Sequence, residues 1–403
     1  MTATGHEKVS KRVIEPAEAR RIEPALAATG SPDVWVYRYE DAARGWLLSI
    51  ATHAEPGSGK LSLGGFRIAP ESRASLPGYD NDREAIELAM GMEEKVEWSR
   101  LLHVGGPRAL AAVGRVVGGK CVLRPTPDAR IGAPRDRELL DFAIACMREF
   151  EATSGVYLTT GQDLGHGVMS DGATASLEYL NARFAGSVLA DTSKPTGEGN
   201  YHLLVGMLRA CGVPIGRARV ALVGAGNIGR HIVGRLAEAG ATATALELRA
   251  ETRAQLALAG VRSRPPEEKA AFLAEPADAV VVNSAGGSLD PEAIAIIARN
   301  DAVRVVCGSE NLTMPDPRGA ATLLAARKVF APTELGGMMG YLTAVEEYLA
   351  KREGGVSDVR VLLEAARRLD TVGERGTRRV VESGYAMSFE DAVRAEFGGA
   401  TRD

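Results

Sequence analysis

Cysteines are few in this sequence, and long apolar runs are absent. The 403 residues include only four cysteines, and no CxxC pair occurs among Cys121, Cys146, Cys211 and Cys307. We therefore expect neither a zinc site nor a dithiol redox site, and reduced thiols in the cytoplasm. The six histidines have no metal-ligand spacing, so the sequence predicts no metal centre.

No apolar stretch approaches the roughly 20 residues that span a bilayer. Residues 1–16 are charged and lack the apolar segment of a secretory signal, so we expect neither a membrane partner nor export. The 48 Lys and Arg against 52 Asp and Glu leave a formal net charge of −4. This balance gives no electrostatic reason to bind nucleic acid. With 45% hydrophobic and 25% charged residues the composition is that of a globular protein.

The pattern of apolar residues changes near residue 200. Before it, residues 33–52 predict a β-hairpin, and residues 83–102 and 134–152 predict helices. From Arg217 onward, short apolar strands alternate with helices, which is typical of a parallel, doubly wound sheet. We therefore predict an α/β protein of two domains with a helical tail that returns to the first domain, divided at residues 1–195, 196–340 and 341–403.

Two segments of the first domain predict strands interrupted by glycine pairs. Gly64 and Gly65 divide the segment LSLGGFRIAP, and Gly118 and Gly119 divide the segment VGRVVGGKCVLRPTPD. A glycine inside a strand indicates a bulge or the close approach of another backbone.

The second domain opens with a dinucleotide-binding motif. Gly224, Gly226 and Gly229 form GxGxxG, which follows the strand RVALV and opens a helix at Asn227. Such glycines allow a tight turn, and the helix N-terminus holds a pyrophosphate. Glu247 ends the next strand at the position where a carboxylate accepts hydrogen bonds from the adenosine ribose. A carboxylate there repels a 2′-phosphate, so we expect NAD as the cofactor, although Arg249 and Arg253 lie nearby.

Six further segments, in the right order between about residue 33 and 348, resemble the Glu/Leu/Phe/Val amino-acid dehydrogenase family. They are LGGFR (63–67), LAMGMEEK (88–95), VGGKCVL (117–123), YLTTGQDLG (157–165), CGSENL (307–312) and VFAPTELGG (329–337). Each segment is weak alone, but the set is specific. The resemblance implies an N-terminal substrate-binding and oligomerisation domain, a Rossmann domain for NAD, and a homo-oligomer of at least two chains. It implies a small-molecule partner, an amino acid or its 2-oxo acid.

The resemblance also implies roles for individual residues. Lys120 and Asp163 fall at the catalytic positions, where a lysine activates water and a carboxylate moves protons to and from the substrate nitrogen. Lys95 falls at the position that holds the substrate α-carboxylate. The implied substrate contacts are Gly64, Gly65, Lys95, Arg108, Asn311 and Glu334. The implied cofactor contacts are Gly224, Gly226, Asn227, Ile228, Gly229, Glu247, Ser284, Ala285 and Asn311.

The sequence also departs from the family pattern. Lys95 and Lys120 stand further apart than the family's two lysines, and the inserted segment predicts a helix to about Leu102 and a second short helix. If the insertion is placed earlier, Arg108 takes the carboxylate-binding position, so both cations remain open. Gly199 stands where the family has a threonine that contacts the nicotinamide amide.

Two other departures lie in the second half of the chain. Leu312 replaces the second asparagine of the family's GSANN, and Glu310 replaces its alanine. Glu310 and Glu334 either face the pocket, which would favour a basic or polar substrate side chain, or lie in solvated loops. His103 and His166 are either proton-transfer groups or plain loop residues.

Three functions follow from these residues. The first is the NAD-dependent, reversible oxidative deamination of an L-amino acid. The second is the reduction or oxidation of an imine of an unusual amino acid in specialised metabolism, which the insertion, Gly199 and Leu312 suggest. The third is a non-catalytic dinucleotide-binding sensor, which the presence of Lys120 and Asp163 disfavours.

Overall fold

The computed structural model describes residues 9–161 and 163–399, so part of the N-terminal stretch expected to lack a signal lies outside the described residues. The chain forms two compact units. The first comprises the residues up to Val96, Ala111–Ala190 and Ala344–Ser357. The second comprises Glu97–Leu110, Asp191–Thr343 and the residues from Asp358 onward.

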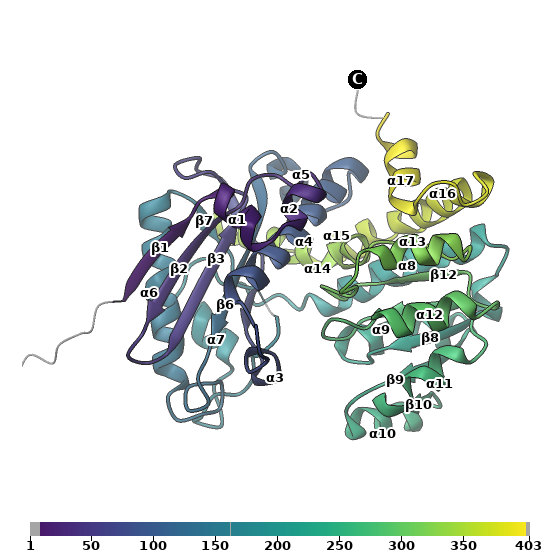
Figure 1. Cartoon of the computed structure of the whole chain (residues 1–403), viewed down its shortest axis with the longest axis horizontal. Helices are drawn as coiled ribbons and strands as arrows, with labels where there is room; N and C mark the ends of the chain where they lie inside the picture. The colour runs from purple at the N-terminus through teal and green to yellow at the C-terminus, as the bar shows by residue number, and fades with distance from the viewer. Residues whose placement is uncertain (1–8, 162, 400–403) are drawn as a thin grey trace, which may run out of the picture. The chain divides into compact units, whose positions relative to one another are not determined.

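The first unit is built on a mixed seven-stranded sheet (Figure 1). Six strands follow the order β1-β2-β3-β6-β4-β7, and β5 pairs with β6. β1, β2, β3 and β6 run antiparallel to one another in that order, whereas β4 and β5 run parallel to β6. The strands are β1 (Ser10–Ile14), β2 (Trp35–Asp41), β3 (Trp46–Thr52), β4 (Leu61–Leu63), β5 (Phe66–Ile68), β6 (Val116–Arg124) and β7 (Tyr157–Leu158). The hairpin predicted within residues 33–52 is β2 and β3.

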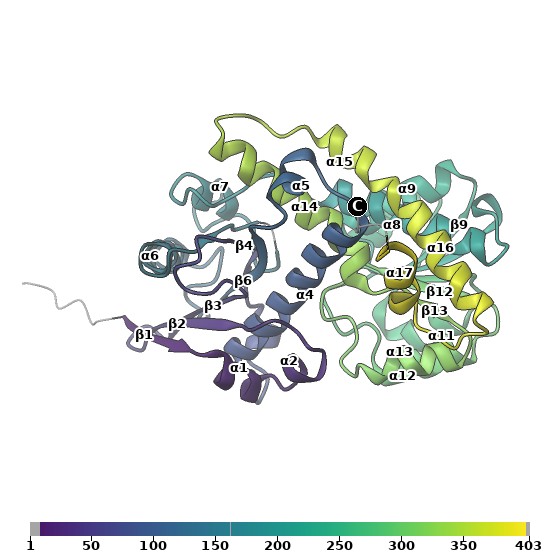
Figure 2. The ribbon, with the colours of Figure 1, turned by 90° about the horizontal axis from the view of Figure 1, so that it is seen from above.

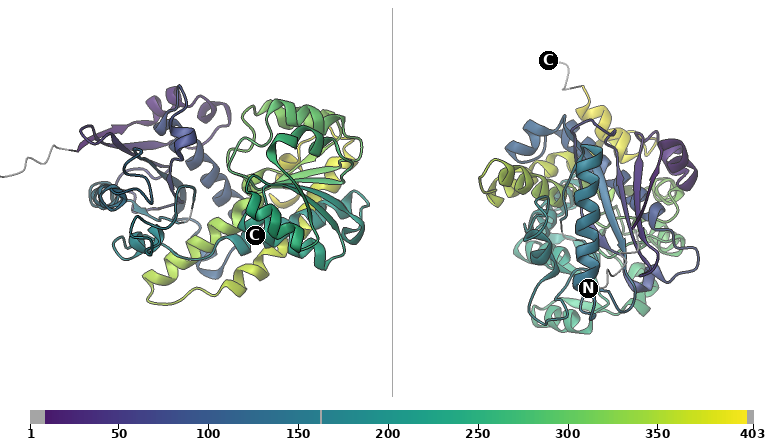
Figure 3. Two further views of the ribbon diagram at one scale, coloured as in Figure 1. Left: turned by 90° about the horizontal axis from the view of Figure 1, so that it is seen from below. Right: turned by 90° about the vertical axis from the view of Figure 1, so that its left-hand side faces the viewer.

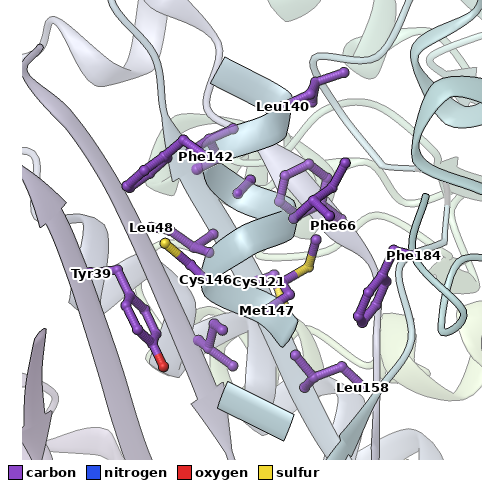
Figure 4. Packing of buried hydrophobic residues seen from close by; sticks show 14 of the residues in the cluster. Tyr39, Leu48, Phe66, Cys121, Leu140, Phe142, Cys146, Met147, Leu158 and Phe184 are labelled. Atoms are coloured by element: carbon purple, nitrogen blue, oxygen red, sulfur yellow. The ribbon is translucent and has the colours of Figure 1, made fainter. Parts of the chain in front are cut away.

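Helix α6 (Asp136–Ser154) supplies much of the apolar core of this unit. Figure 4 shows Phe142, Cys146 and Met147 of this helix among Leu48 and Phe66 of the strands. The apolar residues of α6 recur at helical spacing, which is why one face of the helix is buried against the sheet. The other helices up to residue 181 are α1 (Pro16–Ile22), α2 (Ala25–Ala28), α3 (Glu71–Ala74), α4 (Asn81–Leu102), α5 (Pro107–Ala112) and α7 (Ser176–Asn181).

Strand β6 differs from its prediction, because the glycine pair does not interrupt it. A Cβ at Gly118 would lie 2.2 Å from the backbone nitrogen of Glu93 on α4, and one at Gly119 would lie 2.0 Å from Ser62 Oγ on β4. The two glycines therefore allow a helix and a strand to approach a continuous β6 closely. The helix to Leu102 and the short second helix predicted between Lys95 and Lys120 are both present as α4 and α5.

The second unit contains a parallel six-stranded sheet with the order β10-β9-β8-β11-β12-β13. Numbered from β8, this is the 3-2-1-4-5-6 order of dinucleotide-binding domains. Helices cover both faces of the sheet (Figure 3). Its strands are β8 (Arg219–Val223), β9 (Thr242–Leu246), β10 (Arg262–Arg264), β11 (Ala279–Val282), β12 (Val305–Gly308) and β13 (Val329–Phe330). The helices that follow β7 are, besides α7, α8 (Ser193–Ala210), α9 (Asn227–Glu238), α10 (Ala250–Leu258), α11 (Lys269–Ala274), α12 (Pro291–Arg299), α13 (Arg318–Ala325) and α14 (Thr333–Arg352), with 3₁₀ turns at Ile215–Arg217 and Pro266–Glu268.

The C-terminal tail is divided differently from the prediction that it returns to the first domain. Residues 344–357 belong to the first unit, but α15 (Val359–Ala366), α16 (Arg368–Glu382) and α17 (Phe389–Phe397) belong to the second. Helix α16 lies along α8 (Figure 2). The two helices approach closely because Gly206 of α8 and Gly373 of α16 have no side chain at the contact, where a Cβ would meet the backbone of the other helix. Within the described ranges no helix combines the length and the apolar character that a bilayer span requires.

Candidate active site

Lys120 and Asp163 form a buried ion pair in the first unit. Lys120 lies in the middle of β6, with 3% of its side chain exposed, and its Nζ contacts Asp163 Oδ2. Asp163 lies on the segment after β7, which runs beside β5 through hydrogen bonds from Phe66 N to Gly161 O and from Ile68 N to Leu164 O. Sheet pairing therefore brings together two residues that are 43 positions apart in the sequence. The two residues predicted to be catalytic are in direct contact.

Arg67 and Glu84 complete this cluster, and the sequence analysis assigned no role to either. Arg67 on β5 donates to Asp163 Oδ1 from Nη2 at 3.1 Å and to Glu84 Oε1 from Nη1 at 2.7 Å. Its side chain is 2% exposed, and that of Glu84, on α4, is 4% exposed. The two buried cations and two buried carboxylates thus compensate one another, as buried charges require, and the partly exposed Arg73 also pairs with Glu84 Oε1 at 3.4 Å. The arginine of the LGGFR motif was the signal that could have identified this group.

Burial and the charges of this cluster shift the pKa values of both predicted catalytic residues. Burial lowers the pKa of Lys120 below that of an ordinary lysine; Asp163 opposes this shift and Arg67 adds to it. Burial alone would raise the pKa of Asp163, but the charges of Arg67 and Lys120 outweigh it and hold this pKa well below its usual range. Asp163 is therefore ionised at neutral pH, and Lys120 is the group closer to titration.

Gly64 and Gly65 keep the space beside the ion pair open. A Cβ at Gly64 would lie 1.7 Å from the carbonyl oxygen of Gly119, so this glycine allows close packing of the backbone on β6. A Cβ at Gly65 would lie 2.8 Å from Lys120 Nζ and 3.5 Å from Asp163 Cβ. Any side chain at position 65 would therefore occupy the space next to the reactive groups.

The remaining residues predicted to contact substrate are distributed over both units. Lys95 is 4% exposed on α4 and belongs to the first unit, with Lys120. Arg108 on α5, Asn311 after β12 and Glu334 in the first turn of α14 are half-buried and belong to the second unit. Lys95 and Arg108, the two alternatives for holding the carboxylate, thus lie in different units.

The GxGxxG motif forms a turn suited to a dinucleotide. Gly224 has φ +87° and a Cβ there would lie 2.7 Å from Asn283 O, so only glycine fits. A Cβ at Gly229 would lie 2.3 Å from Gly224 O, which explains the third glycine. Helix α9 begins at Asn227 with Gly226 as N-cap and has no side-chain cap, so the amides of its first turn, including that of Ile228, point to a ligand position.

Glu247 is buried against this turn. Its Oε2 accepts from Ala225 N at 2.8 Å and its Oε1 from Arg249 N at 2.9 Å. Arg253 Nη1 donates to the carbonyl oxygens of Glu247 and Leu248 at 2.8 and 2.7 Å, whereas the side chain of Arg249 is 61% exposed. The carboxylate is thus held by the backbone of the turn and by Arg249, whose Nε lies 3.5 Å from Glu247 Oε1, whereas Arg253 donates to backbone carbonyl oxygens.

Glu310 is not a solvated loop residue. It is 2% exposed at the end of β12, and its carboxylate accepts from Ser284 N at 2.9 Å and from Ser288 N at 2.8 Å. Burial raises the pKa of Glu310. This side chain therefore anchors the loop after β11, which contains Ser284 and Ala285, two of the predicted cofactor contacts.

His166 supports the cluster through the backbone. Its Nε2 donates to Phe66 O at 2.7 Å, and its Nδ1 accepts from Ser176 Oγ at 3.0 Å. Burial lowers the pKa of this imidazole, which stays neutral between β5 and α7. His103 is exposed at the end of α4, where its carbonyl oxygen accepts from Arg368. In the described part of the chain no three His, Cys, Asp or Glu side chains gather as a metal site.

Comparison with solved structures shows which fold the chain has. No family profile and no curated protein matches the sequence. The structure is similar to L-tryptophan dehydrogenase from Nostoc punctiforme, with TM-score 0.60 and 16% identity over 93% of this chain and 97% of that chain. It is similar to the hetero-hexameric glutamate dehydrogenase from Thermus thermophilus in its Leu-bound form, with TM-score 0.61 and 14% identity over 98% and 89%. For Plasmodium falciparum glutamate dehydrogenase the values are 0.59 and 12% over 94% and 85%.

The chain has the amino-acid dehydrogenase fold. The resemblance read from six short segments is thereby confirmed at the level of the fold.

Within this amino-acid dehydrogenase fold, Gly199 marks a real departure. A Cβ at Gly199 on α8 would lie 2.7 Å from Met339 Cγ of α14 and 3.2 Å from Leu369 Cδ1 of α16. The space that a threonine side chain would need is filled by two helices of the same unit. Leu312 has φ +52°, and its carbonyl oxygen accepts from Gly287 N, so it belongs to a tight turn beside the loop that Glu310 anchors.

Proposed function

We propose that this protein is an NAD-dependent oxidoreductase that acts on the CH–NH₂ group of an L-amino acid and interconverts it with the 2-oxo acid. The observation that carries the proposal is the buried ion pair of Lys120 and Asp163, open on the side of Gly65. The same chain carries the Gly224–Gly229 turn at the start of α9. The dehydrogenase fold of the similar structures supports the assignment.

Lys120 is the proposed base toward water. Burial lowers its pKa, so the amine can lose its proton at a pH where a surface lysine remains charged. The neutral amine then accepts a proton from the water that attacks the substrate imine carbon. The resulting ammonium is stabilised by the ionised carboxylate of Asp163.

Asp163 is the proposed partner of the substrate nitrogen. Its Oδ1 accepts from Arg67 and from Leu164 N, which fixes the carboxylate and leaves Oδ2 directed at Lys120. A substrate amine that separates Lys120 from Oδ2 removes a cation from the carboxylate, which raises its pKa toward proton acceptance. Arg67 and Glu84 hold this geometry in place, and are positioning residues in this proposal.

The residues of the Gly224–Gly229 turn fit a nicotinamide dinucleotide. The amides of Asn227 and Ile228 would hold the pyrophosphate, and Glu247 would accept the ribose hydroxyls. When bound, the nicotinamide takes up the hydride from the substrate Cα. We assign NAD rather than NADP because the buried carboxylate of Glu247 repels a 2′-phosphate, and because Arg253 is held by backbone carbonyls.

Lys95 is our proposed partner for the substrate α-carboxylate. It is buried in the same unit as Lys120 and Asp163, whereas Arg108 belongs to the other unit. A cation fixed in the unit that holds the base can orient Cα relative to Lys120 without depending on the second unit.

Gly199 favours a second candidate, the reduction or oxidation of an imine of an unusual amino acid. The packing of Met339 and Leu369 at this position leaves no side chain to contact the nicotinamide amide. Without that contact the nicotinamide ring can take a different position relative to the substrate Cα. Such a position suits a specialised substrate better than a common one.

One assay separates these functions. In a mixture of the protein, NAD and one or more of the common L-amino acids, the absorbance of the reduced cofactor should rise. In a mixture of the protein, reduced cofactor, ammonia and a 2-oxo acid, it should fall. Turnover confined to unusual amino acids or cyclic imines would support the second candidate. Tight binding of NAD with no turnover on any substrate would indicate a sensor and contradict both. A tighter dissociation constant for NADP than for NAD would overturn the cofactor assignment.

A further inference from the structure

The first unit contains a cavity that neither Lys120 nor Asp163 lines. Its volume is about 520 Å³, and it lies where β5 and β6 end and α3 begins. This volume is in the range of small-molecule sites. The lining comes from four places in the chain: the turn at Gly45, the stretch within residues 68–75, the stretch within residues 124–131, and Gly165.

Arg124 is the charged lining residue of this cavity that has no ion-pair partner among the described residues. It ends β6 with a half-buried side chain, and no hydrogen bond or ion pair joins that side chain to any other described residue. A half-buried guanidinium without a counter-charge favours the binding of an anion, and its planar fork matches a carboxylate. Arg130 also lines the cavity, but its Nη1 is paired with Glu71 Oε2 at 2.6 Å, and both side chains are more than half exposed.

Most of the remaining wall is apolar and stiff; its polar members, Ser75 and Thr126, donate their hydroxyls to Glu71 O and Asp128 Oδ1. Ile68, Ala69, Ala74 and Ile131 line the cavity together with three prolines, Pro70, Pro125 and Pro127. Proline fixes its own backbone angle, so the wall requires little ordering when a ligand enters. A ligand with an apolar body and one carboxylate could pack its body against these walls and pair its carboxylate with Arg124.

The acid at the rim disfavours a ligand that also carries an ammonium group. Glu71 is the carboxylate among the lining residues, and it is already paired with Arg130. The ammonium group of an amino acid would therefore have to compete with Arg130 for the carboxylate of Glu71. A plain carboxylate has no such requirement.

We propose that this cavity binds a small organic monocarboxylate with an apolar body, whose carboxylate pairs with Arg124. The site is distinct from the catalytic cluster, because Lys120 lies four residues earlier on β6, about 13 Å along the strand. The two sites are nevertheless connected through the backbone. Ile68 of the cavity directly follows Arg67, and Gly165 of the cavity is separated from Asp163 by one residue.

The experiment uses 3-phenylpropanoate as the probe, because it has the carboxylate and the apolar body but neither a 2-oxo nor an amino group. Calorimetric titration of the full chain should show one binding event in a Lys120→Ala background, where the catalytic cluster is disabled. Arg124→Gln should weaken this binding by about tenfold, the value of one charge-assisted contact. Glu71→Gln should tighten it, because Arg130 is released and a negative charge leaves the rim.

Three controls make the result specific. Arg115→Gln removes an exposed arginine of the same unit outside the cavity and should leave the affinity unchanged. Ala74→Trp should block the cavity while Arg124 remains, and 3-phenylpropanamide should not bind. Absence of binding, equal affinity in the Arg124→Gln protein, or binding that is present in the unmodified protein but lost with Lys120→Ala would each overturn the proposal. None of these readouts needs turnover, so the result is independent of the proposed function.

Discussion

Lys120 and Asp163 illustrate how burial turns ordinary side chains into reactive ones. A lysine and an aspartate in contact on an exposed surface would form only a weak ion pair. Here both side chains are at most 9% exposed, and Arg67 adds a second cation to the pair. Burial lowers the pKa of Lys120, and the two cations hold the pKa of Asp163 well below its usual range, so Lys120 is the member of the pair whose charge can change.

The first prediction concerns the pH dependence of this pair. The pKa of Lys120 is lowered in the folded protein, so kcat/KM for amino-acid oxidation should rise as the pH climbs through that value. The plateau should begin below the pKa of about 10.4 of an ordinary lysine. Lys120→Ala should lower kcat by about a thousandfold, and Asp163→Asn should behave similarly.

Binding of NAD provides the control for these variants. Both residues belong to the unit without the Gly224–Gly229 turn, so the dissociation constant for NAD should stay close to that of the unmodified protein. A near-normal rate in Lys120→Ala, or a pH profile identical to that of a surface lysine, would contradict the assignment.

The second prediction decides between the two candidate cations. Lys95→Ala should raise KM for the amino acid by about tenfold or more with a smaller change in kcat, because a charged contact to the α-carboxylate is lost. Arg108→Ala should change KM little. A large rise of KM in Arg108→Ala with none in Lys95→Ala would transfer the carboxylate-binding role to Arg108.

At the scale of elements, Glu310 connects the segment that follows β12 to the loop that follows β11. Its buried carboxylate accepts two backbone amides of the loop at residues 284–288. Removal of the carboxylate would leave both amides without their acceptor, which costs about 1–3 kcal/mol for each buried group. Gly287 N and Leu289 N also donate to the carbonyl oxygens of Leu312 and Thr313, so Glu310 adds a side-chain anchor to two backbone contacts.

The third prediction follows from this anchor. Glu310→Ala should lower the melting temperature and weaken NAD binding, because Ser284 and Ala285 lose their fixed position. Glu310→Gln keeps one carbonyl acceptor and should give an intermediate loss of both. Glu292→Ala, an exposed acid on α12 of the same unit, serves as the matched control and should change stability by less than about 0.5 kcal/mol. Unchanged NAD affinity in Glu310→Ala would show that the loop does not contact the cofactor.

At the scale of the whole molecule, β1 is the edge strand of the first unit's sheet. It pairs with β2, and four of its five residues are exposed. Val13 is 38% exposed there. The unpaired backbone groups of an edge strand, here with Val13 exposed, form a surface on which a second copy can pair. The Thermus thermophilus glutamate dehydrogenase to which this chain is similar is a hetero-hexamer.

The fourth prediction is that the protein is at least a dimer at micromolar concentration, as light scattering would measure. If β1 contributes to the interface, Val13→Asp should shift the mass toward the monomer. Val361→Asp places the same charge at a 40% exposed valine of the other unit and should leave the mass unchanged. A monomer in the unmodified protein would contradict the expected assembly.

Local patterns in the sequence were sufficient for most of the elements. The hairpin within residues 33–52 and the helices at 83–102 and 134–152 follow from the spacing of apolar residues over one or two turns or strands. Ser388 with Asp391 predicts an N-cap, and Ser388 Oγ accepts from Asp391 N at 3.0 Å. These signals act between neighbours in the chain, so they can be read without knowledge of the fold.

The sequence by itself determined the main helices and strands, the glycine turn beside Glu247 and, through the family resemblance, the pair of residues, Lys120 and Asp163, to examine for chemistry. Only the tertiary structure decided that Arg67 joins that pair, since Arg67 and Asp163 are 96 residues apart. It also decided that Glu310 is buried and that α16 packs on α8. The physical reason is that sheet pairing and helix packing bring distant residues together, and no local periodicity encodes which partners meet.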